Sequence, residues 1–316
     1  MMDAEERELF AKSLRQAAAG ASGPALDAAL DDLGWPDAIA VDPRAAVSLL
    51  FEAQGGSGTT SSALDRVLLA ALGVAPGAGV VLPSAGRWDP PGARAGEGLA
   101  VDGLATAGLA ERAEAVVVAP SGDGFVAATV DPGDLDLREI EGIDPRLGLV
   151  AVAGEAVPVA ATRPAAWAEA LAAGQRALAH ELVGASRAML GLARDHAVER
   201  IQFGRPIAAF QAVRHRLAEA LVAVESADAA IAAAWDDPAP LTAALAKALA
   251  GRGARTVARH AQQVLAGIGF TTEHDLHTYV RRVLVLDRLL GDAGSLTRRL
   301  GEDLLADRHL PAILPL

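Results

Sequence analysis

The sequence predicts a mainly α-helical protein with a small β-domain between two helical regions. Three observations predict this order. Residues 1–73 carry apolar side chains at helical spacing, residues 74–162 contain short β-type runs between glycines and prolines, and residues 163–316 return to long helical stripes. We therefore expect three domains with these boundaries, the last of them a four-helix bundle.

Composition narrows the function. The chain has 316 residues, of which 52% are hydrophobic and 22% charged, so a sizeable core is expected. It has no cysteine, which excludes disulfides, thiolate metal sites and cysteine nucleophiles. The net charge of −12 argues against a nucleic-acid partner. No apolar run approaches the roughly 18 residues of a membrane span, and the acidic start does not resemble a secretory signal, so we expect a cytoplasmic protein with no membrane partner.

The first two regions divide into short elements. Apolar stripes predict helices in the first region at residues 9–14, 45–53 and 61–72. Glycine and proline predict breaks at residues 19–24, 34–36 and 55–58. In the second region, β-type runs at residues 115–119, 125–130 and 147–153 predict a small antiparallel sheet or barrel.

The third region contains four apolar stripes joined by short breaks. The stripes lie at residues 178–192, 207–224, 241–264 and 276–290. Phe210 and Leu217 belong to the second stripe and are expected to be buried in the bundle.

Common catalytic motifs are absent from the sequence. It has no P-loop, no G-x-S-x-G, no H-E-x-x-H and no G-x-G-x-x-G after a strand. His274 and His277 are the one close histidine pair, and no clear set of further ligands accompanies them, so no metal site is predicted.

Two other segments have unusual residue choices. Residues 199–215, ERIQFGRPIAAFQAVRH, read as a helix end, a tight turn and a proline that opens the next helix. Residues 263–276, QVLAGIGFTTEHDL, place a glutamine before G-x-G and an aromatic residue. Glycines of this kind let backbone amides approach a phosphate or a planar ring.

Together these segments resemble two motifs of the acyl-CoA dehydrogenase family, E-R-x-x-F-G-x-P-[IL]-x-x-F-Q and Q-x-x-G-G-x-G-[FY]. The resemblance covers residues 164–308, and the helix–β–helix order agrees with it. The N-terminal region matches only loosely, at residues 33–35 and 55–58, and would be a shortened version of the family's first domain.

The resemblance implies FAD binding across a subunit interface. Arg200 matches the arginine that reaches the flavin pyrophosphate, and is therefore expected near a neighbouring subunit. Phe203 matches the aromatic residue near adenine, and Gln211 the amide that bonds the dinucleotide. Gln263 and Gly267 match the residues that receive the adenosine diphosphate of the neighbouring subunit.

The chain also departs from the family's motifs. Leu265 stands where the family often has an aromatic residue or histidine, and Ala266 replaces the first glycine. Residues 80–84 and 104–108 lack the acidic and aromatic members of the family's flavin-contacting strands.

A carboxylate in this family removes the α-proton of an acyl-CoA while a hydride passes to the flavin. The family places that base at one of two positions, which correspond here to Leu290 and Gly174. Neither residue is acidic, so no catalytic residue is predicted in this chain. Asp292 and Glu181 are weak candidates nearby, and we expect both to be solvated, Asp292 at a helix C-terminus and Glu181 on an exposed helix face.

Three functions remain open at this point. The chain resembles the shortened, base-less subunit of actinobacterial α2β2 acyl-CoA dehydrogenases that oxidise bulky CoA thioesters such as those of sterol side chains. It would then complete the FAD site of a homologous catalytic partner. The alternatives are a self-sufficient FAD-dependent acyl-CoA dehydrogenase with an unconventional carboxylate base, and a flavin-less structural paralogue.

Overall fold

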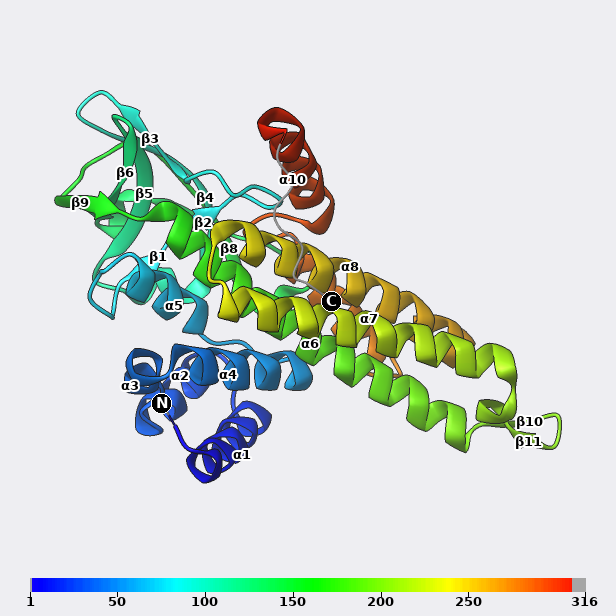
Figure 1. Cartoon of the computed structure of the whole chain (residues 1–316). Helices are drawn as coiled ribbons and strands as arrows, with labels where there is room; N and C mark the ends of the chain where they lie inside the picture. The colour runs from blue at the N-terminus through cyan, green and yellow to red at the C-terminus, as the bar shows by residue number, and fades with distance from the viewer. Residues whose placement is uncertain (1, 309–316) are drawn as a thin grey trace.

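The computed structural model describes residues 2–308, and it confirms the predicted order of helices, strands and helices. The first group comprises α1 (Ala4–Gly20), α2 (Pro24–Asp32), α3 (Trp35–Val41), α4 (Pro43–Ser57) and α5 (Ala63–Ala71). Figure 1 shows these helices below the strands, and the later helices extending from both as a long bundle.

The predicted break at residues 55–58 is partly wrong, because α4 continues through Gly55 and Gly56 and ends at Ser57. The reason is packing against α6 (Trp167–Glu199). A Cβ atom on Gly55 would collide with the backbone of Glu181 and Ala185, and one on Gly184 would collide with the backbone of Glu52. The two glycines therefore let α4 and α6 approach closely, while Gly58 ends α4 at a φ of 66°.

We expect Gly55→Ala to destabilise the fold by about 1–3 kcal/mol, because the added methyl group forces α4 away from α6. Gly56→Ala is the matched control, since its Cβ atom would lie 3.9 Å from the carbonyl oxygen of Gly184. Alanine also favours the helix there by about 0.5–1 kcal/mol. Chemical denaturation of both variants measures the difference. Equal stability of the two would contradict the close approach of α4 and α6.

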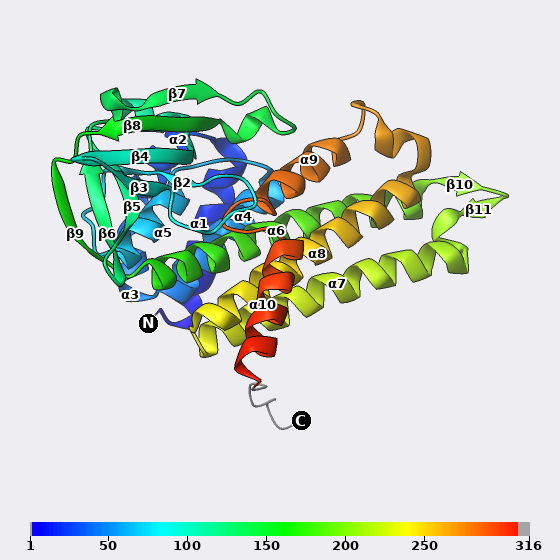
Figure 2. The ribbon, with the colours of Figure 1, turned by 90° about the horizontal axis from the view of Figure 1, so that it is seen from above.

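The strands form two stacked sheets. One has the order β1-β5-β6-β9 and the other the order β2-β4-β8-β7, with β3 pairing to β4. Val117 and Val130 of the first sheet and Val101 and Val152 of the second share one apolar cluster. Figure 2 shows the ribbons of both sheets, with β4 and β8 in one and β6 and β9 in the other. The pairing is antiparallel except between β1 and β5. The bounds are β1 Gly79–Val80, β2 Leu82–Pro83, β3 Gly92–Ala95, β4 Gly98–Thr106, β5 Ala115–Ser121, β6 Gly124–Val130, β7 Asp136–Glu139, β8 Leu149–Val157 and β9 Ala161–Ala165.

The bundle consists of α6, α7 (Gln211–Asp236), α8 (Pro240–Leu265) and α9 (Leu276–Leu286). A short hairpin of β10 (Ile201–Gln202) and β11 (Arg205–Pro206) joins α6 to α7 at the far end. The prediction that the fourth stripe is one helix to residue 290 is wrong, because α9 ends at Leu286 and a separate α10 (Ala293–Asp307) lies across α8. Leu290 and Gly291 form the turn, with φ angles of 55° and 97°. Among residues 2–308, no helix has the length and apolar character needed to cross a bilayer.

The predicted burial of Phe210 and Leu217 is also wrong, since both are half-buried. The fully buried positions of α7 begin later, at Ala220, and continue through Val224 and Ile231, whereas Leu217 packs against the core from a partly exposed position. The first two turns of α7 therefore leave apolar surface uncovered in the single chain.

Candidate functional site

The first motif lies at the far end of the bundle. Arg200 caps the C-terminus of α6, and Phe203 and Gly204 form the hairpin turn with φ angles of 53° and 78°. The side chain of Phe203 is 91% exposed and meets Phe210 edge-to-face, with 5.9 Å between the ring centroids. Gln211 begins α7 and is exposed, with its amide nitrogen 3.3 Å from a ring nitrogen of His215.

The second motif lies at the same end, because α8 runs in the direction of α6 and ends beside the hairpin (Figure 1). Gln263 and Gly267 are both exposed there. Nothing lies within 4 Å of a Cβ atom built on Gly267, so packing alone does not require a glycine at this position. The structure thus brings both predicted cofactor-binding segments to one open end of the bundle.

Ala266 has a φ of 52°, in the region that favours glycine. An alanine in this conformation is strained by about 1–3 kcal/mol. The sequence already indicated this strain, since Ala266 replaces a glycine of the resembled motif. The replacement raises the conformational energy of the backbone and also brings a methyl group to the surface where the ligand would approach.

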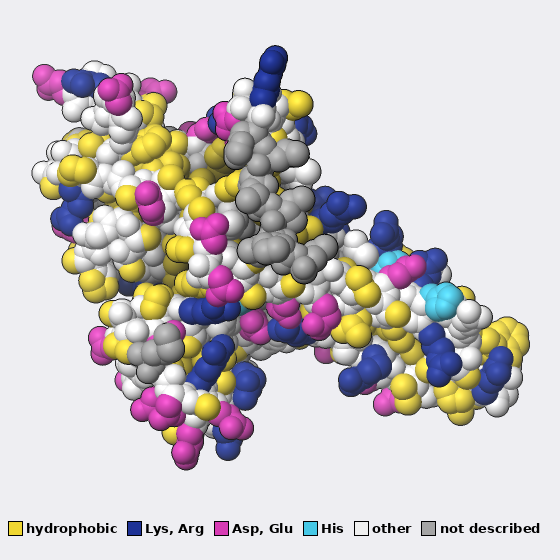
Figure 3. Space-filling model, in the orientation of Figure 1, with side chains coloured by type: hydrophobic (Ala, Val, Ile, Leu, Met, Phe, Trp, Pro, Cys, Tyr) yellow, Lys and Arg dark blue, Asp and Glu magenta, His cyan; other side chains and the backbone are white. Residues whose placement is uncertain are grey.

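Exposed apolar side chains lie within the two motifs and next to the first of them. Figure 3 shows hydrophobic side chains among arginines at this end of the molecule. The exposed members are Val198 at 58%, Ile201 at 62%, Phe203 at 91%, Ile268 at 38% and Phe270 at 71%. Clustered exposed apolar residues of this kind mark an interaction surface.

The two positions matched to the family base meet inside the protein. A Cβ atom on Gly174 of α6 would lie 2.5 Å from Cδ1 of Leu290 and 3.0 Å from Cδ2 of Leu68. Leu290 itself is 0% exposed. The two positions therefore share one point in space although they come from different segments, and aliphatic side chains fill that point.

Trp88 covers the turn next to Leu290, and sequence reasoning missed it. Its ring carbon Cε3 lies 3.2 Å from a Cβ atom built on Gly291, and its carbonyl oxygen accepts a hydrogen bond of 3.1 Å from Nε1 of Trp167. The amide of Gln175 donates to the carbonyl oxygen of Leu290 at 3.0 Å. The only earlier signal was a large aromatic residue in a glycine- and proline-rich stretch of a chain with 3% aromatic residues.

Asp292 is not at a helix C-terminus, so that expectation is wrong. It is the N-cap of α10 and accepts hydrogen bonds from the backbone N–H groups of Gly294 and Ser295, at 3.0 and 3.1 Å. Burial opposes ionisation, but these bonds, a further one from the Ser295 hydroxyl and the charge of Arg288 together lower the pKa of Asp292. An ionised capping carboxylate is a poor proton acceptor and a good helix stabiliser.

Glu181 is not on a solvated face either, because it is only 4% exposed. One of its oxygens lies 3.5 Å from Nη1 of Arg282, whose Nε donates to Asp144 at 2.6 Å. Burial raises the pKa of Glu181 to about 7, although the charge of Arg282 opposes this. Glu181 thus belongs to a buried ion cluster, which we define as Glu181, Arg282 and Asp144.

The raised pKa of Glu181 predicts that stability falls as the pH rises from about 4.5 to about 7. In that window the folded state holds the proton that the unfolded chain has released, and a higher pH therefore favours unfolding, by roughly 3 kcal/mol at most. Glu181→Gln should show a flatter profile over the same window. Denaturant unfolding at several pH values measures it, and parallel profiles for the two proteins would contradict the raised pKa.

The helix–β–helix fold and the two motifs at one end of the bundle define a protein of the acyl-CoA dehydrogenase class. A family model described as the acyl-CoA dehydrogenase C-terminal domain matches residues 165–305. The chain belongs to the acyl-CoA dehydrogenase family.

Several relatives come from Mycobacterium tuberculosis, among them IpdE2 and FadE34. Acyl-CoA dehydrogenase IpdE2 is 40% identical over 123 residues, which are 39% of this chain and 39% of IpdE2. Acyl-CoA dehydrogenase FadE34 is 36% identical over 248 residues, which are 76% of this chain and 29% of FadE34. The match thus spans less than half of the length of either relative.

Solved structures agree in fold. The Tcur3481–Tcur3483 steroid acyl-CoA dehydrogenase, as its G363A variant, has a TM-score of 0.80 at 24% identity, covering 96% of this chain and 98% of that one. The ChsE4–ChsE5 complex from Mycobacterium tuberculosis has a TM-score of 0.73 at 23% identity, covering 97% of this chain and 89% of that one.

Proposed function

We propose that this chain is a subunit of an FAD-dependent acyl-CoA dehydrogenase, in which it completes the flavin site of a homologous catalytic partner and has no base of its own. The reaction would be the α,β-desaturation of a CoA thioester. The observation that carries the proposal is the contact between Gly174 and Leu290, because both positions matched to the family base are buried and aliphatic. A side chain at Gly174 would collide with Leu290, so Leu290 fills the space next to Gly174 with a group that cannot accept a proton.

The donors at the far end of the bundle fit the dinucleotide part of FAD. Arg200 is exposed and forms no ion pair within residues 2–308, so its guanidinium is free to hold the pyrophosphate. Gln211 and Gln263 would supply amide hydrogen bonds, and the open surface at Gly267 would let the ligand approach the backbone. When bound, FAD supplies the hydride acceptor of the reaction.

A partner subunit would also cover the apolar side chains around the motifs. More than half of the surface of Ile201, Phe203 and Phe270 is exposed in the single chain. Such a cluster of exposed apolar side chains is typical of a surface that a partner covers. ChsE4 and ChsE5 form a complex, and we propose that this chain likewise pairs with a homologous subunit, in an α2β2 assembly. The acyl-CoA substrate would then be held mainly by the catalytic partner.

One observation favours a second function, a self-sufficient dehydrogenase. Glu181 is a buried carboxyl group whose pKa is raised to about 7, the range expected of a general base at neutral pH. Its ion pair with Arg282 and its position about 10 Å along α6 from Gly174 make the subunit function the better supported one.

Co-expression with a catalytic acyl-CoA dehydrogenase subunit encoded in the same genome tests the proposal, with any such gene adjacent to its own taken first. We expect the chain to be colourless when purified alone and to become yellow, with bound FAD, when it co-purifies with that partner. A yellow chain that oxidises acyl-CoA alone would establish the self-sufficient enzyme. If the complex never binds FAD, the chain would instead be a flavin-less structural paralogue.

Arg200→Ala should weaken FAD binding by the assembled complex roughly ten- to a hundred-fold, because it removes a charge-assisted contact of about 1.5–3 kcal/mol. Equilibrium dialysis of the flavin measures the affinity. Arg15→Ala, an exposed arginine on α1, is the matched control and should change nothing. Undiminished FAD affinity in Arg200→Ala would refute the assigned role of Arg200.

A further inference from the structure

A cavity of about 780 Å³ lies between the N-terminal helices and the bundle, outside the motifs described above. It is bounded by α3, α4, α5, α6 and the end of α7. Most of its wall is aliphatic, including Ile39, Val67 and Val74. Its volume is in the range of sites that hold organic molecules of drug size.

One charged side chain stands out in this wall. Arg176 is only 8% exposed, and its Nε and Nη1 atoms have no hydrogen-bond partner among the described residues. No carboxylate within residues 2–308 forms an ion pair with it. Burial lowers the pKa of Arg176, and no neighbouring charge contributes to that shift. A buried, unpaired guanidinium is costly, so its persistence needs an explanation.

The guanidinium of Arg176 is positioned by the ring of Trp235. Its guanidinium carbon lies 5.0 Å from the ring centroid of Trp235, a cation–π contact. Nε1 of Trp235 donates to Nε2 of His180 at 3.0 Å, and the other ring nitrogen of His180 lies 3.0 Å from a carboxylate oxygen of Glu52. The polar atom of Trp235 is thus already used, and the ring can offer Arg176 only its π-face.

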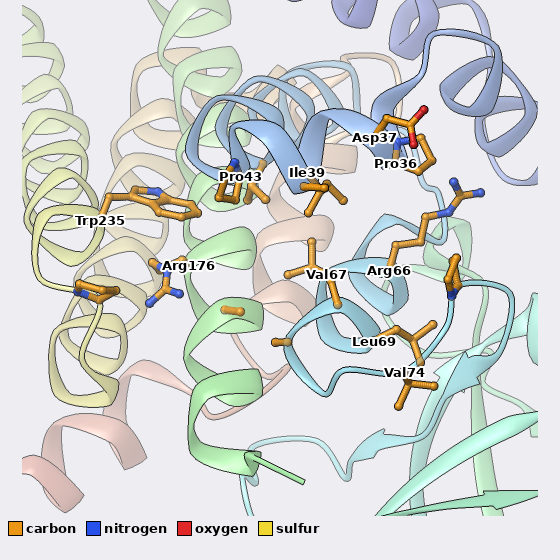
Figure 4. A pocket seen from close by; sticks show the side chains of 17 residues that line it. Pro36, Asp37, Ile39, Pro43, Arg66, Val67, Leu69, Val74, Arg176 and Trp235 are labelled. Atoms are coloured by element: carbon orange, nitrogen blue, oxygen red, sulfur yellow. The ribbon is translucent and has the colours of Figure 1, made fainter. Parts of the chain in front are cut away.

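The cavity has two different ends. Figure 4 shows Arg176 and Trp235 at one end, Arg66 and Asp37 at the other, and Ile39 and Val67 between them. Arg66 is paired with Asp31, so it is not an equivalent anchor for an anion. A ligand that neutralises Arg176 would therefore have its negative charge at one end and an apolar body along the cavity.

The site is distinct from the position matched to the catalytic base. Arg176 follows Gly174 by two residues, which is roughly 200° around α6. The Gly174 side of α6 faces Leu290, Leu68 and Leu64, whereas the Arg176 side faces Trp235.

We propose that this cavity binds an amphipathic organic carboxylate, with its carboxylate on Arg176 beside Trp235 and its apolar body against Ile39 and Val67. The planar guanidinium suits a carboxylate because it can donate two parallel hydrogen bonds. A carboxylate bound across Nη1 and Nη2 would satisfy Nη1, one of the two nitrogen atoms that the protein leaves unpaired. The inference does not depend on flavin binding or on the catalytic role of the chain.

The test compares dodecanoate with dodecan-1-ol, which has the same chain length and no charge, at concentrations below micelle formation. Isothermal titration of the full chain, alone and in complex with its partner, measures both affinities. We expect saturable binding of dodecanoate, at least ten-fold tighter than binding of dodecan-1-ol, and the same preference in the complex. Arg176→Met should weaken dodecanoate about ten- to a hundred-fold and leave dodecan-1-ol within about two-fold.

Two further variants locate the site. Ala40→Trp places a large side chain in the cavity and should weaken both ligands, whereas Arg15→Met, on the exposed face of α1, should affect neither. Without ligand, Arg176→Met should raise Tm, because it removes an unpaired buried charge.

Four results would overturn the proposal. The first two are equal affinity for the acid and the alcohol, and unchanged binding in Ala40→Trp. The third is loss of binding in the complex, which would mean that a side chain of the partner subunit contacts Arg176. The fourth is failure of Arg176→Met to fold. The last would show that Arg176 has a structural partner in the protein.

Discussion

Purified without a partner subunit, the chain should show no measurable acyl-CoA oxidation, because no carboxylate lies at either position matched to the family base. Loss of a general base typically lowers the rate about 10²–10⁴-fold, and the weak acidity of an α-proton favours the upper end. The acyl-CoA is mixed with the protein in the absence of oxygen, and the decrease in flavin absorbance measures the rate of acyl-CoA oxidation directly. The measurement is made on the chain alone after FAD is added and on the complex with its partner.

The two nearby carboxylates supply the controls. Asp292→Asn and Glu181→Gln, made in the complex, should each leave turnover within a few-fold. An amide preserves the shape of a carboxyl group and removes its basicity, so the comparison isolates proton transfer. Asp292→Asn also tests the N-cap of α10, and any loss it causes should appear as lower stability and not as slower turnover.

A hundred-fold loss of turnover in either variant, with FAD still bound, would identify that carboxylate as the base and refute the subunit proposal. A partial loss of turnover together with loss of FAD would mean that the residue stabilises the interface that binds the cofactor. For Glu181 the two readouts separate well, because its expected effect is on the pH dependence of stability. The same variant should therefore change the unfolding profile and leave the turnover unchanged.

Local sequence patterns predicted most of the architecture. The spacing of apolar residues placed α6, α7 and α8, and β-type runs placed β5 and β6 with their antiparallel pairing. These elements depend on local periodicity, which a sequence contains in full. The end of α9 was wrong because the apolar stripe continues through Leu290, although the chain turns there at a φ of 55°.

The errors at the site have a different cause, since they depend on contacts between distant segments. Glu181 was expected on a solvated face, but the approach of α4 at Gly55 and the side chain of Arg282 cover it. Gly174 and Leu290 are more than a hundred residues apart, and only the fold shows that they touch. The lack of a partner for Arg176 is likewise a property of the whole interior, so no motif could have indicated it.

Arg282→Met should cost about 3–5 kcal/mol of folding free energy, the largest stability effect that we expect from a single substitution in this chain. Arg282 is 2% exposed and pairs with Asp144 and Glu181. Its guanidinium also donates to the carbonyl oxygens of Thr59 at 2.7 Å and Gly58 at 3.1 Å. One side chain on α9 thus joins the loop after α4, the β-region and α6. Denaturant unfolding of the variant measures the loss.

Arg281→Met is the matched control, because Arg281 is the neighbouring residue on α9 and is exposed. We expect it to change stability by less than about 0.5 kcal/mol. Removal of Arg282 leaves the carboxyl group of Asp144 buried without its cation, and this accounts for most of the expected loss. Part of the loss should disappear below about pH 7, where the carboxyl group of Glu181 holds its proton and no longer needs a positive neighbour. If the two variants had equal stability at pH 8, Arg282 would not be neutralising buried charge. The raised pKa of Glu181 would then have to come from burial with no opposing cation.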